Sequence, residues 1–233
     1  MSLNTIISQG YLVQFDAHAA SEHGHYFCGA HEIPGAWCPN CDKPLLRLLT
    51  LGMTDGRIRI PGALFEQVHL FFCCTCEVLS ESLFYRILPD SSIELIQFGK
   101  GIIDIEAGYG LPYRGYPSHF PGTPVRLDAL KEDEQEYITL SNRYDHSLPT
   151  REMHNRYRYI YNADHQVGGE PLLWQGHEYW EMFCPMCKKS LPLLATIGGG
   201  CLDSRGLFGM VGGQIVYTFC VECSVMGAVF LTT

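Results

Sequence analysis

Short hydrophobic runs that are rich in β-branched and aromatic residues, and are bounded by turn residues, recur along the chain. The clearest four come in two pairs, residues 68–72 with 83–88 and residues 214–219 with 228–231. This composition between turn residues is typical of β-strands. In each pair the first run leads into a Cys-x-x-Cys sequence and the second leads out of it. We therefore expect each of these cysteine pairs at the tip of a hairpin.

Three further segments have recognisable patterns. Gly, Pro and Tyr dominate residues 108–122, which predicts an irregular connector. Residues 127–137 are the best candidate for a short helix, although their acidic run could also form a solvated loop. Basic and aromatic residues alternate in 151–161, which predicts an amphipathic strand. One face of that strand would carry Tyr157, Tyr159 and Tyr161, and the other Arg156 and Arg158.

The sequence indicates an internal duplication. Residues 38–52 align with 184–198 at a shift of 146, and eight of the 15 aligned positions are identical, where chance gives about one. Each copy continues to a second Cys-x-x-Cys after a similar interval, 31 residues in the first copy and 32 in the second. The repeated units span approximately residues 20–90 and 160–233.

The predicted fold class is mainly β, a β-rich α+β protein with two pseudo-symmetric units that each carry a zinc-ribbon-like cysteine site. An apolar segment follows the first cysteine pair of each unit and predicts another strand. We expect the first unit within residues 1–110, a Gly/Pro-rich and acidic connector in 111–150, and the second unit in 151–233. A chain of 233 residues with 46% hydrophobic residues is large enough to pack these parts as one compact domain.

Cysteine is the most informative residue type, because eight of the 11 cysteines form four Cys-x-x-Cys pairs. Zn²⁺ prefers four tetrahedral ligands, and two such turns supply four thiolates. With every position filled by thiolate no site stays open for water or substrate, so we expect a structural role that adds to the free energy of folding. The sequence predicts two Cys₄ zinc sites, formed by Cys38, Cys41, Cys73 and Cys76 and by Cys184, Cys187, Cys220 and Cys223.

Two other chemistries suit these cysteines. The first pair of each unit resembles locally the Cys-Pro-x-Cys of glutaredoxins, but a redox dithiol needs only one pair, at a helix N-terminus, and here each pair has a partner pair. Iron, alone or in an iron–sulfur cluster, is also compatible with four cysteines. In the first unit Cys74 could replace Cys73 as the ligand; the duplicate favours Cys73, because Val221 matches Cys74.

Other metal-binding residue types gather near the start of the first unit. His23, His25, Cys28 and His31 could in principle hold a third metal ion, whereas the simpler expectation is that they make hydrogen bonds in loops. Cys28 and Cys201 have no counterparts in the other unit, so we expect them to be small buried hydrophobic residues.

Composition and motifs argue against several classes of function. The net charge of −9, from 16 basic and 25 acidic residues, disfavours nonspecific binding to nucleic-acid phosphates. The longest apolar stretches, such as 225–231, are far shorter than the roughly 20 residues of a membrane helix, and the N-terminus lacks a signal-peptide pattern. We expect a soluble, cytoplasmic protein. Because the sequence has no nucleophile elbow, phosphate-binding loop or His-Glu-x-x-His motif, we predict no catalytic residues and no enzyme activity.

Two segments resemble known families. Residues 165–175 resemble the His-x-x-Gly-Gly-x-Pro-x-x-x-Gln signature of the bacterial YwqG-like family. Residues 44–49, which follow a cysteine pair, are similar to a segment of the eukaryotic programmed-cell-death-two proteins, and the two groups are thought to form one superfamily. Ile33-Pro34-Gly35 of the first unit weakly echoes Gly168-Gly169 of the second.

The resemblance implies a β-rich, pseudo-symmetric fold with no established enzyme activity. Eukaryotic members act as chaperones for a small-subunit ribosomal protein, and some bacterial members look like immunity proteins. Our expectation is therefore a non-enzymatic zinc protein that binds a client protein, such as a basic ribosomal protein or a toxin. The alternatives are a zinc-ribbon protein that binds nucleic acid, with help from Arg156 and Arg158, and a thiol or metal enzyme.

Overall fold

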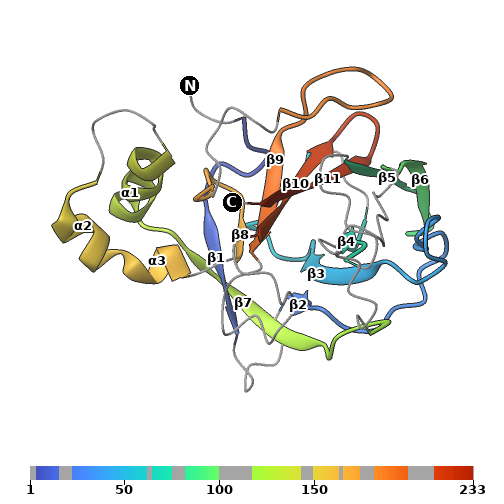
Figure 1. The fold of residues 1–233 in the computed structure, drawn as a ribbon, viewed down its shortest axis with the longest axis horizontal. Coiled ribbons are helices and arrows are strands. Elements are labelled where there is room, and N and C mark those ends of the chain that lie inside the picture. The colour runs from blue at the N-terminus through green and yellow to red at the C-terminus, as the bar shows by residue number, and fades with distance from the viewer. Residues whose placement is uncertain are drawn as a thin grey trace, which may run out of the picture.

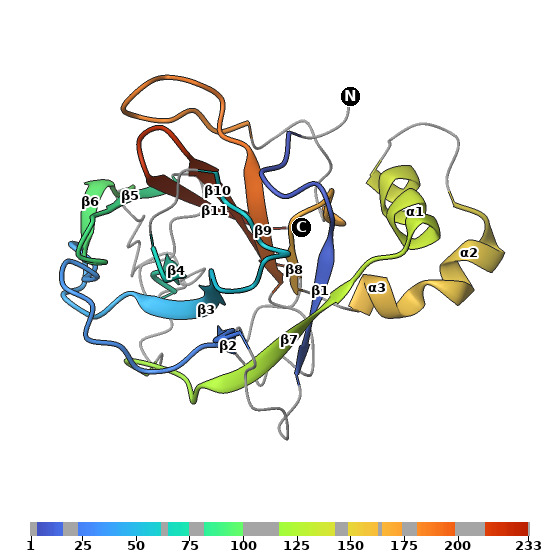
Figure 2. The same cartoon turned by 180° about the vertical axis from the view of Figure 1, so that it is seen from behind.

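The computed structural model describes residues 4–15, 23–61, 65–74, 82–99, 117–142, 149–162, 165–173, 181–198 and 213–232. Within these residues the protein is mainly β, which confirms the predicted fold class. Eleven strands form one curled sheet, and three helices lie beyond β1 and β7, on the side opposite β5 and β6 (Figures 1 and 2). The strand order is β4-β3-β2-β7-β1-β8-β9-β10-β11-β5-β6, and all neighbouring strands pair antiparallel.

The strands and helices follow one another along the chain as follows. The order is β1 (Tyr11–Phe15), β2 (Tyr26–Phe27), β3 (Leu46–Gly52), β4 (Gln67–Phe72), β5 (Leu83–Ile87), β6 (Ile93–Gln97), β7 (Thr123–Ala129), α1 (Glu132–Asn142), α2 (Arg151–Arg156), α3 (Arg158–Asn162), β8 (His165–Val167), β9 (Leu193–Gly198), β10 (Gly213–Cys220) and β11 (Val225–Thr232). No helix among the described residues is long and apolar enough to cross a membrane.

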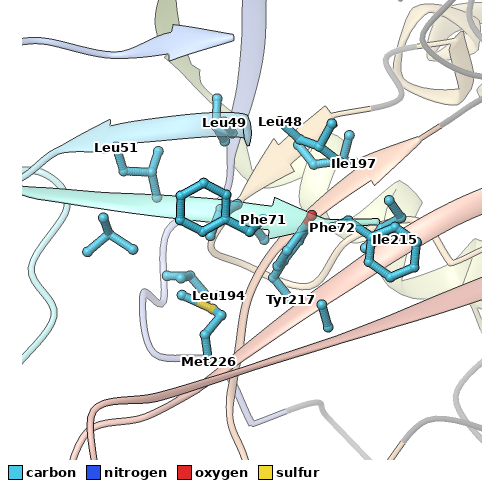
Figure 3. Close-up of a cluster of buried hydrophobic side chains, with 14 of the residues drawn as sticks. Leu48, Leu49, Leu51, Phe71, Phe72, Leu194, Ile197, Ile215, Tyr217 and Met226 are labelled. Atoms are coloured by element: carbon cyan, nitrogen blue, oxygen red, sulfur yellow. The ribbon is translucent and has the colours of Figure 1, made fainter. Parts of the chain in front are cut away.

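One large hydrophobic core joins strands from both predicted units (Figure 3). It forms because strands β3, β4, β9, β10 and β11 turn apolar side chains towards one another, and burial of such side chains contributes roughly 1.5–3 kcal/mol each. The most central of these side chains are at most 4% exposed. They include Leu48, Leu49, Leu51, Phe71, Phe72, Leu194, Ile197, Ile215, Tyr217 and Met226.

Tyr85 links the two ends of the curled sheet. Strand β4 is at one edge of the sheet, and β5 is next to the opposite edge. The hydroxyl of Tyr85, on β5, donates to the carbonyl of His69 at 2.7 Å and accepts from the N–H of Phe71 at 3.1 Å, both on β4. Buried backbone groups need hydrogen-bond partners. This fully buried hydroxyl supplies a partner for one N–H and one carbonyl of the edge strand β4, as a neighbouring strand would.

The predicted hairpins are half right. In the second unit β10 and β11 pair along their length, with Cys220 opposite Val225, so the second cysteine pair lies at the tip of a hairpin as expected. In the first unit β4 and β5 do not pair within the described residues, and that prediction is wrong. Strand β5 pairs with β11 and β6 instead, because its apolar pattern specifies a strand without specifying the neighbour.

Residues 127–137 are only partly helical. Strand β7 continues to Ala129 because Val125 and Leu127 alternate with exposed Arg126, and helix α1 begins only at Glu132. The acidic run does open this helix, where carboxylates favour the positive end of the helix dipole. Of the expected connector 108–122, residues 108–116 lie outside the described residues, and residues 117–122 form no helix or strand.

The strand predicted for 151–161 is wrong, because α2 and α3 occupy this segment. Thr150 caps α2, with its side chain accepting from the N–H of Met153 at 3.2 Å. Met153, Tyr157 and Ile160 lie at helical spacing and pack in one cluster with α1. Tyr157 is buried and Tyr159 is about half exposed, so no shared face of tyrosines forms between them.

Replacing Tyr85 with Phe tests the link between the sheet ends. The variant keeps the buried ring but leaves one N–H and one carbonyl of β4 unsatisfied, so we expect a loss of about 1–3 kcal/mol in the free energy of unfolding. Chemical denaturation at neutral pH measures it. The matched control is Tyr26→Phe, an exposed tyrosine on β2, which should cost almost nothing. Equal stability of the two variants would contradict the assigned role.

Candidate metal centres

The structure brings all four predicted ligands of the second unit together. Cys184 and Cys187 lie in the turn before β9, and Cys220 and Cys223 lie at the β10–β11 tip. Their sulfur atoms are all within 4.8 Å of one another, and Sγ of Cys187 is 3.7 Å from Sγ of Cys220. Four thiolates about 2.3 Å from one central ion would be separated by about 3.8 Å. The group therefore has the dimensions of a tetrahedral site that could hold one metal ion.

Backbone geometry shapes the turn that carries the first two of these cysteines. The N–H of Cys184 donates to the carbonyl of Lys189 at 2.8 Å, and the N–H of Lys188 donates to the carbonyl of Cys184 at 2.8 Å. Lys188 has a left-handed backbone with φ of 62°, which a tight turn of this kind requires. An isolated bridge between Phe183 and Ser190 closes the base of the turn.

A backbone hydrogen bond and burial shift the pKa values of the thiols at the second centre in opposite directions. The backbone N–H of Lys189 donates to Cys187 and lowers the pKa of that thiol, whereas burial raises the pKa of Cys220 to about 12 and also raises that of Cys223. Only thiolates bind metal, so a cation would displace the remaining protons. Lys189 and Glu222 form an exposed ion pair at 2.5 Å that connects the two turns.

The structure brings together three of the four predicted ligands of the first unit. The sulfurs of Cys38, Cys41 and Cys73 lie within 4.8 Å of one another, with 3.8 Å between those of Cys41 and Cys73. Cys76 lies outside the described residues. Cys74 is buried in the hydrophobic core and is not part of the group. The choice of Cys73 over Cys74, made from the duplicate, agrees with this arrangement.

The two cysteine turns are built alike. The N–H of Cys38 donates to the carbonyl of Lys43 at 2.8 Å, and that of Asp42 donates to the carbonyl of Cys38 at 3.0 Å. Asp42 has a left-handed φ of 56°, and an isolated bridge joins Trp37 to Pro44. Each of these contacts has its counterpart 146 residues later. The similarity of the units thus extends to backbone geometry at these positions, while the duplication itself stays a prediction.

A second match corrects the sequence comparison of the units. The N–H groups of Cys28 and Gly168 donate to the equivalent carbonyls of Leu48 and Leu194, at 2.9 and 2.8 Å. Cys28, like Gly168, has a left-handed backbone, with φ of 58° and 65°. Cys28-Gly29 therefore takes the place of Gly168-Gly169, rather than Ile33-Pro34-Gly35. The sequence hid this match because the shift here is 140 residues.

Two of the three histidines near Cys28, His25 and His31, make the expected side-chain hydrogen bonds. His25 accepts from the N–H of Gly52 at 3.0 Å through Nδ1, so its Nε2 carries the proton that is donated to Asp55 at 3.0 Å. Nε2 of His31 donates to the carbonyl of Leu45 at 2.7 Å. The described residues contain no third group of side chains arranged for a metal ion. Cys28 is buried as predicted, whereas Cys201 lies outside the described residues.

Residues of the segment that resembles the YwqG-like signature hold helix α1 against the sheet. Gly168 and Gly169 have left-handed backbones and approach other backbone atoms so closely that a Cβ would clash. Asn142, at the end of α1, donates to the carbonyl of Pro171 at 2.7 Å and to the carboxylate of Glu170 at 3.3 Å. The role of Glu170 had no signal in the sequence. Gln175 lies outside the described residues.

Comparison with models of known protein families finds no match for this chain, and comparison with curated proteins finds none either. Its function is therefore inferred from the geometry of the two cysteine groups and the surface around them.

Replacing each of two neighbouring cysteines with alanine, in separate variants, tests the ligand assignment. Cys73→Ala removes a sulfur from the first group, so we expect the purified chain to lose one metal ion and several kcal/mol of stability. Cys74→Ala is the matched control, because it removes an adjacent buried thiol that is not in the group, and it should retain every ion. Native mass spectrometry counts the ions. A loss caused by Cys74→Ala alone would overturn the assignment.

His69 on β4 makes stability depend on pH. Burial, with Arg47 and His31 nearby, lowers the pKa of His69 to about 4. Because the folded pKa lies below the unfolded value of about 6.5, the stabilising contribution is complete above pH 6.5 and is lost as the pH falls towards 4.

We expect the wild type to lose about 2 kcal/mol more than His69→Gln between pH 7 and pH 5. Urea denaturation at both pH values, with metal in excess, measures the difference. Equal losses in the free energy of unfolding for the wild type and His69→Gln would contradict the prediction.

Proposed function

We propose that the protein is a non-enzymatic zinc protein, in which two Cys₄ centres stabilise a β scaffold that binds a basic client protein. The observation that carries the proposal is the convergence of Cys184, Cys187, Cys220 and Cys223 at tetrahedral spacing. Four thiolates complete the coordination of one Zn²⁺, leave no open position for substrate, and give the site a structural role. Cys38, Cys41 and Cys73 supply three ligands of the equivalent centre, for which we propose Cys76 as the fourth.

The sulfur spacing favours a single ion over the other cysteine chemistries. A cluster of several irons would distribute its four thiolates over different irons, and would hold some of them further apart than the 4.8 Å within which all four sulfurs of the second group lie. A disulfide would bring two sulfurs to about 2.05 Å, and none joins the described cysteines. A glutaredoxin-like dithiol belongs at a helix N-terminus, but strands β3 and β9 follow the two Cys-Pro-x-Cys turns.

Exposed apolar side chains at both centres support protein binding. Trp37 and Phe183 are 55% and 53% exposed, and each immediately precedes the first cysteine of its centre. Met186, within the second turn, is 54% exposed. Large apolar side chains held in a rigid turn lose little entropy when a partner covers them, and aromatic residues are frequent anchors of protein interfaces.

The charge of the chain supports a basic partner. The net charge of −9 gives the molecule a negative field that attracts cationic proteins and repels nucleic acids. The resemblance to chaperones of a ribosomal protein is consistent with such a client. Binding through these surfaces would be steered by charge and anchored by the exposed apolar side chains.

Affinity capture with matched variants tests the proposal. The tagged, zinc-loaded chain is mixed with nuclease-treated lysate of its host, and we expect it to retain one basic protein in stoichiometric amount. The double variant Trp37→Ala/Phe183→Ala should lose this protein, whereas Tyr26→Ala, which removes an exposed aromatic side chain elsewhere, should keep it. Equal recovery with all three chains, or recovery with none, would contradict the proposed client surface.

A further inference from the structure

Arg47 is a half-buried cation with an unsatisfied nitrogen. It lies on β3 opposite Phe71 of β4, and its Nε is buried without a hydrogen-bond partner among the described residues. Its Nη2 lies only 2.5 Å from the point where a Cβ of Gly29 would stand. Gly29 has a φ of +110°, which favours glycine, and its missing side chain leaves room for the guanidinium.

No negative charge in the described part of the chain balances Arg47. None of the ion pairs found there includes it. Burial raises the pKa of the nearby Cys28 thiol to about 12, so the thiol stays neutral. Burial also lowers the pKa of His31, and lowers that of His69 to about 4, so both imidazoles are neutral at pH 7. Among the described residues, Arg47 is therefore a positive charge without a compensating negative charge.

The second unit shows that the fold does not require this charge. Arg47 pairs with Phe71 beside a bulge, and Leu193 pairs with Thr218 at the matching place on β9 and β10. His69 opposite Thr50 likewise corresponds to Val216 opposite Thr196. Leu193 and Val216 are both fully buried. Because an unpaired cation in a half-buried site costs free energy that an aliphatic side chain does not, Arg47 is explained by binding rather than by packing.

We infer that Arg47, with His69 beside it, binds the carboxylate of a ligand. The guanidinium presents a planar fork of N–H donors that matches a carboxylate in shape. A single positive charge with neutral imidazoles nearby matches a monoanion better than a phosphate dianion. His69 is hydrogen-bonded to Thr50 at 3.0 Å through Nδ1, which fixes its ring next to the cation. The carboxylate belongs either to a small molecule or to the C-terminus of a peptide.

Proton–nitrogen NMR of the full, zinc-loaded chain tests this site directly. The Nε–H resonance of Arg47 is identified by its absence in Arg47→Leu. We expect acetate to shift this resonance saturably at constant ionic strength and pH 7.5, and acetamide, its neutral analogue, to leave it unchanged. Triglycine distinguishes the two ligand sources. Tighter binding of triglycine than of acetate indicates a peptide C-terminus, and weaker binding indicates a small carboxylate. Triglycine amide, which lacks the terminal carboxylate, is the matched control.

Two variants complete the test. Arg47→Leu should melt no lower than the wild type in chloride buffer, because the second unit has leucine at this position, and acetate should no longer stabilise it. Arg126→Leu removes an exposed arginine that is paired with Asp128, and it should respond to acetate like the wild type. A shift that is unsaturable or equal with acetamide, or a lower melting temperature for Arg47→Leu without any acetate effect, would overturn the inference. Zinc content and client capture are measured in separate experiments. A negative outcome there would contradict the proposed function without affecting the test of the carboxylate site at Arg47.

Discussion

The tight turn around the first Cys-x-x-Cys of each unit, Cys38 to Cys41 and Cys184 to Cys187, is the constraint on which the rest of the molecule depends. Two backbone hydrogen bonds and one left-handed residue, Asp42 or Lys188, hold the first two sulfurs of each group on the same side of the chain. The turn also sets the point where β3 or β9 begins, and these strands supply much of the hydrophobic core. A metal ion at the sulfurs would connect that start to the end of the antiparallel neighbour, β4 or β10, and so fix one end of the strand pair.

Strand pairing then merges the two predicted units into one sheet. Strand β1 pairs with β8, and β5 pairs with β11, so strands of the first unit flank those of the second on both sides. The hydroxyl of Tyr85 joins the sheet ends, and Glu170 with its neighbours holds α1 in place. The sheet therefore connects the two cysteine groups to each other and to helix α1. The exposed apolar side chains at each group project from turns that are joined directly to this sheet.

Features encoded over short sequence distances could be predicted, whereas those decided by distant contacts could not. The cysteine spacing and the repeat identified seven residues that the structure gathers into two groups, because a tight turn determines where its own sulfurs lie. The partner of β5 could not be inferred, since the apolar pattern of Leu83–Ile87 predicts a strand but does not specify its neighbours, which are β11 and β6. The alternation of Arg and Tyr in 151–161 concealed the helical spacing of Met153, Tyr157 and Ile160. The position of Arg47 opposite Phe71 exists only once β3 and β4 have paired.

X-ray absorption at the zinc edge, on the purified full-length chain, tests the central claim most directly. The account predicts two zinc ions per chain, each surrounded by four sulfurs at about 2.3 Å with no oxygen or nitrogen ligand. One ion per chain, nitrogen or oxygen in the first coordination sphere, or iron with a second iron nearby would contradict it.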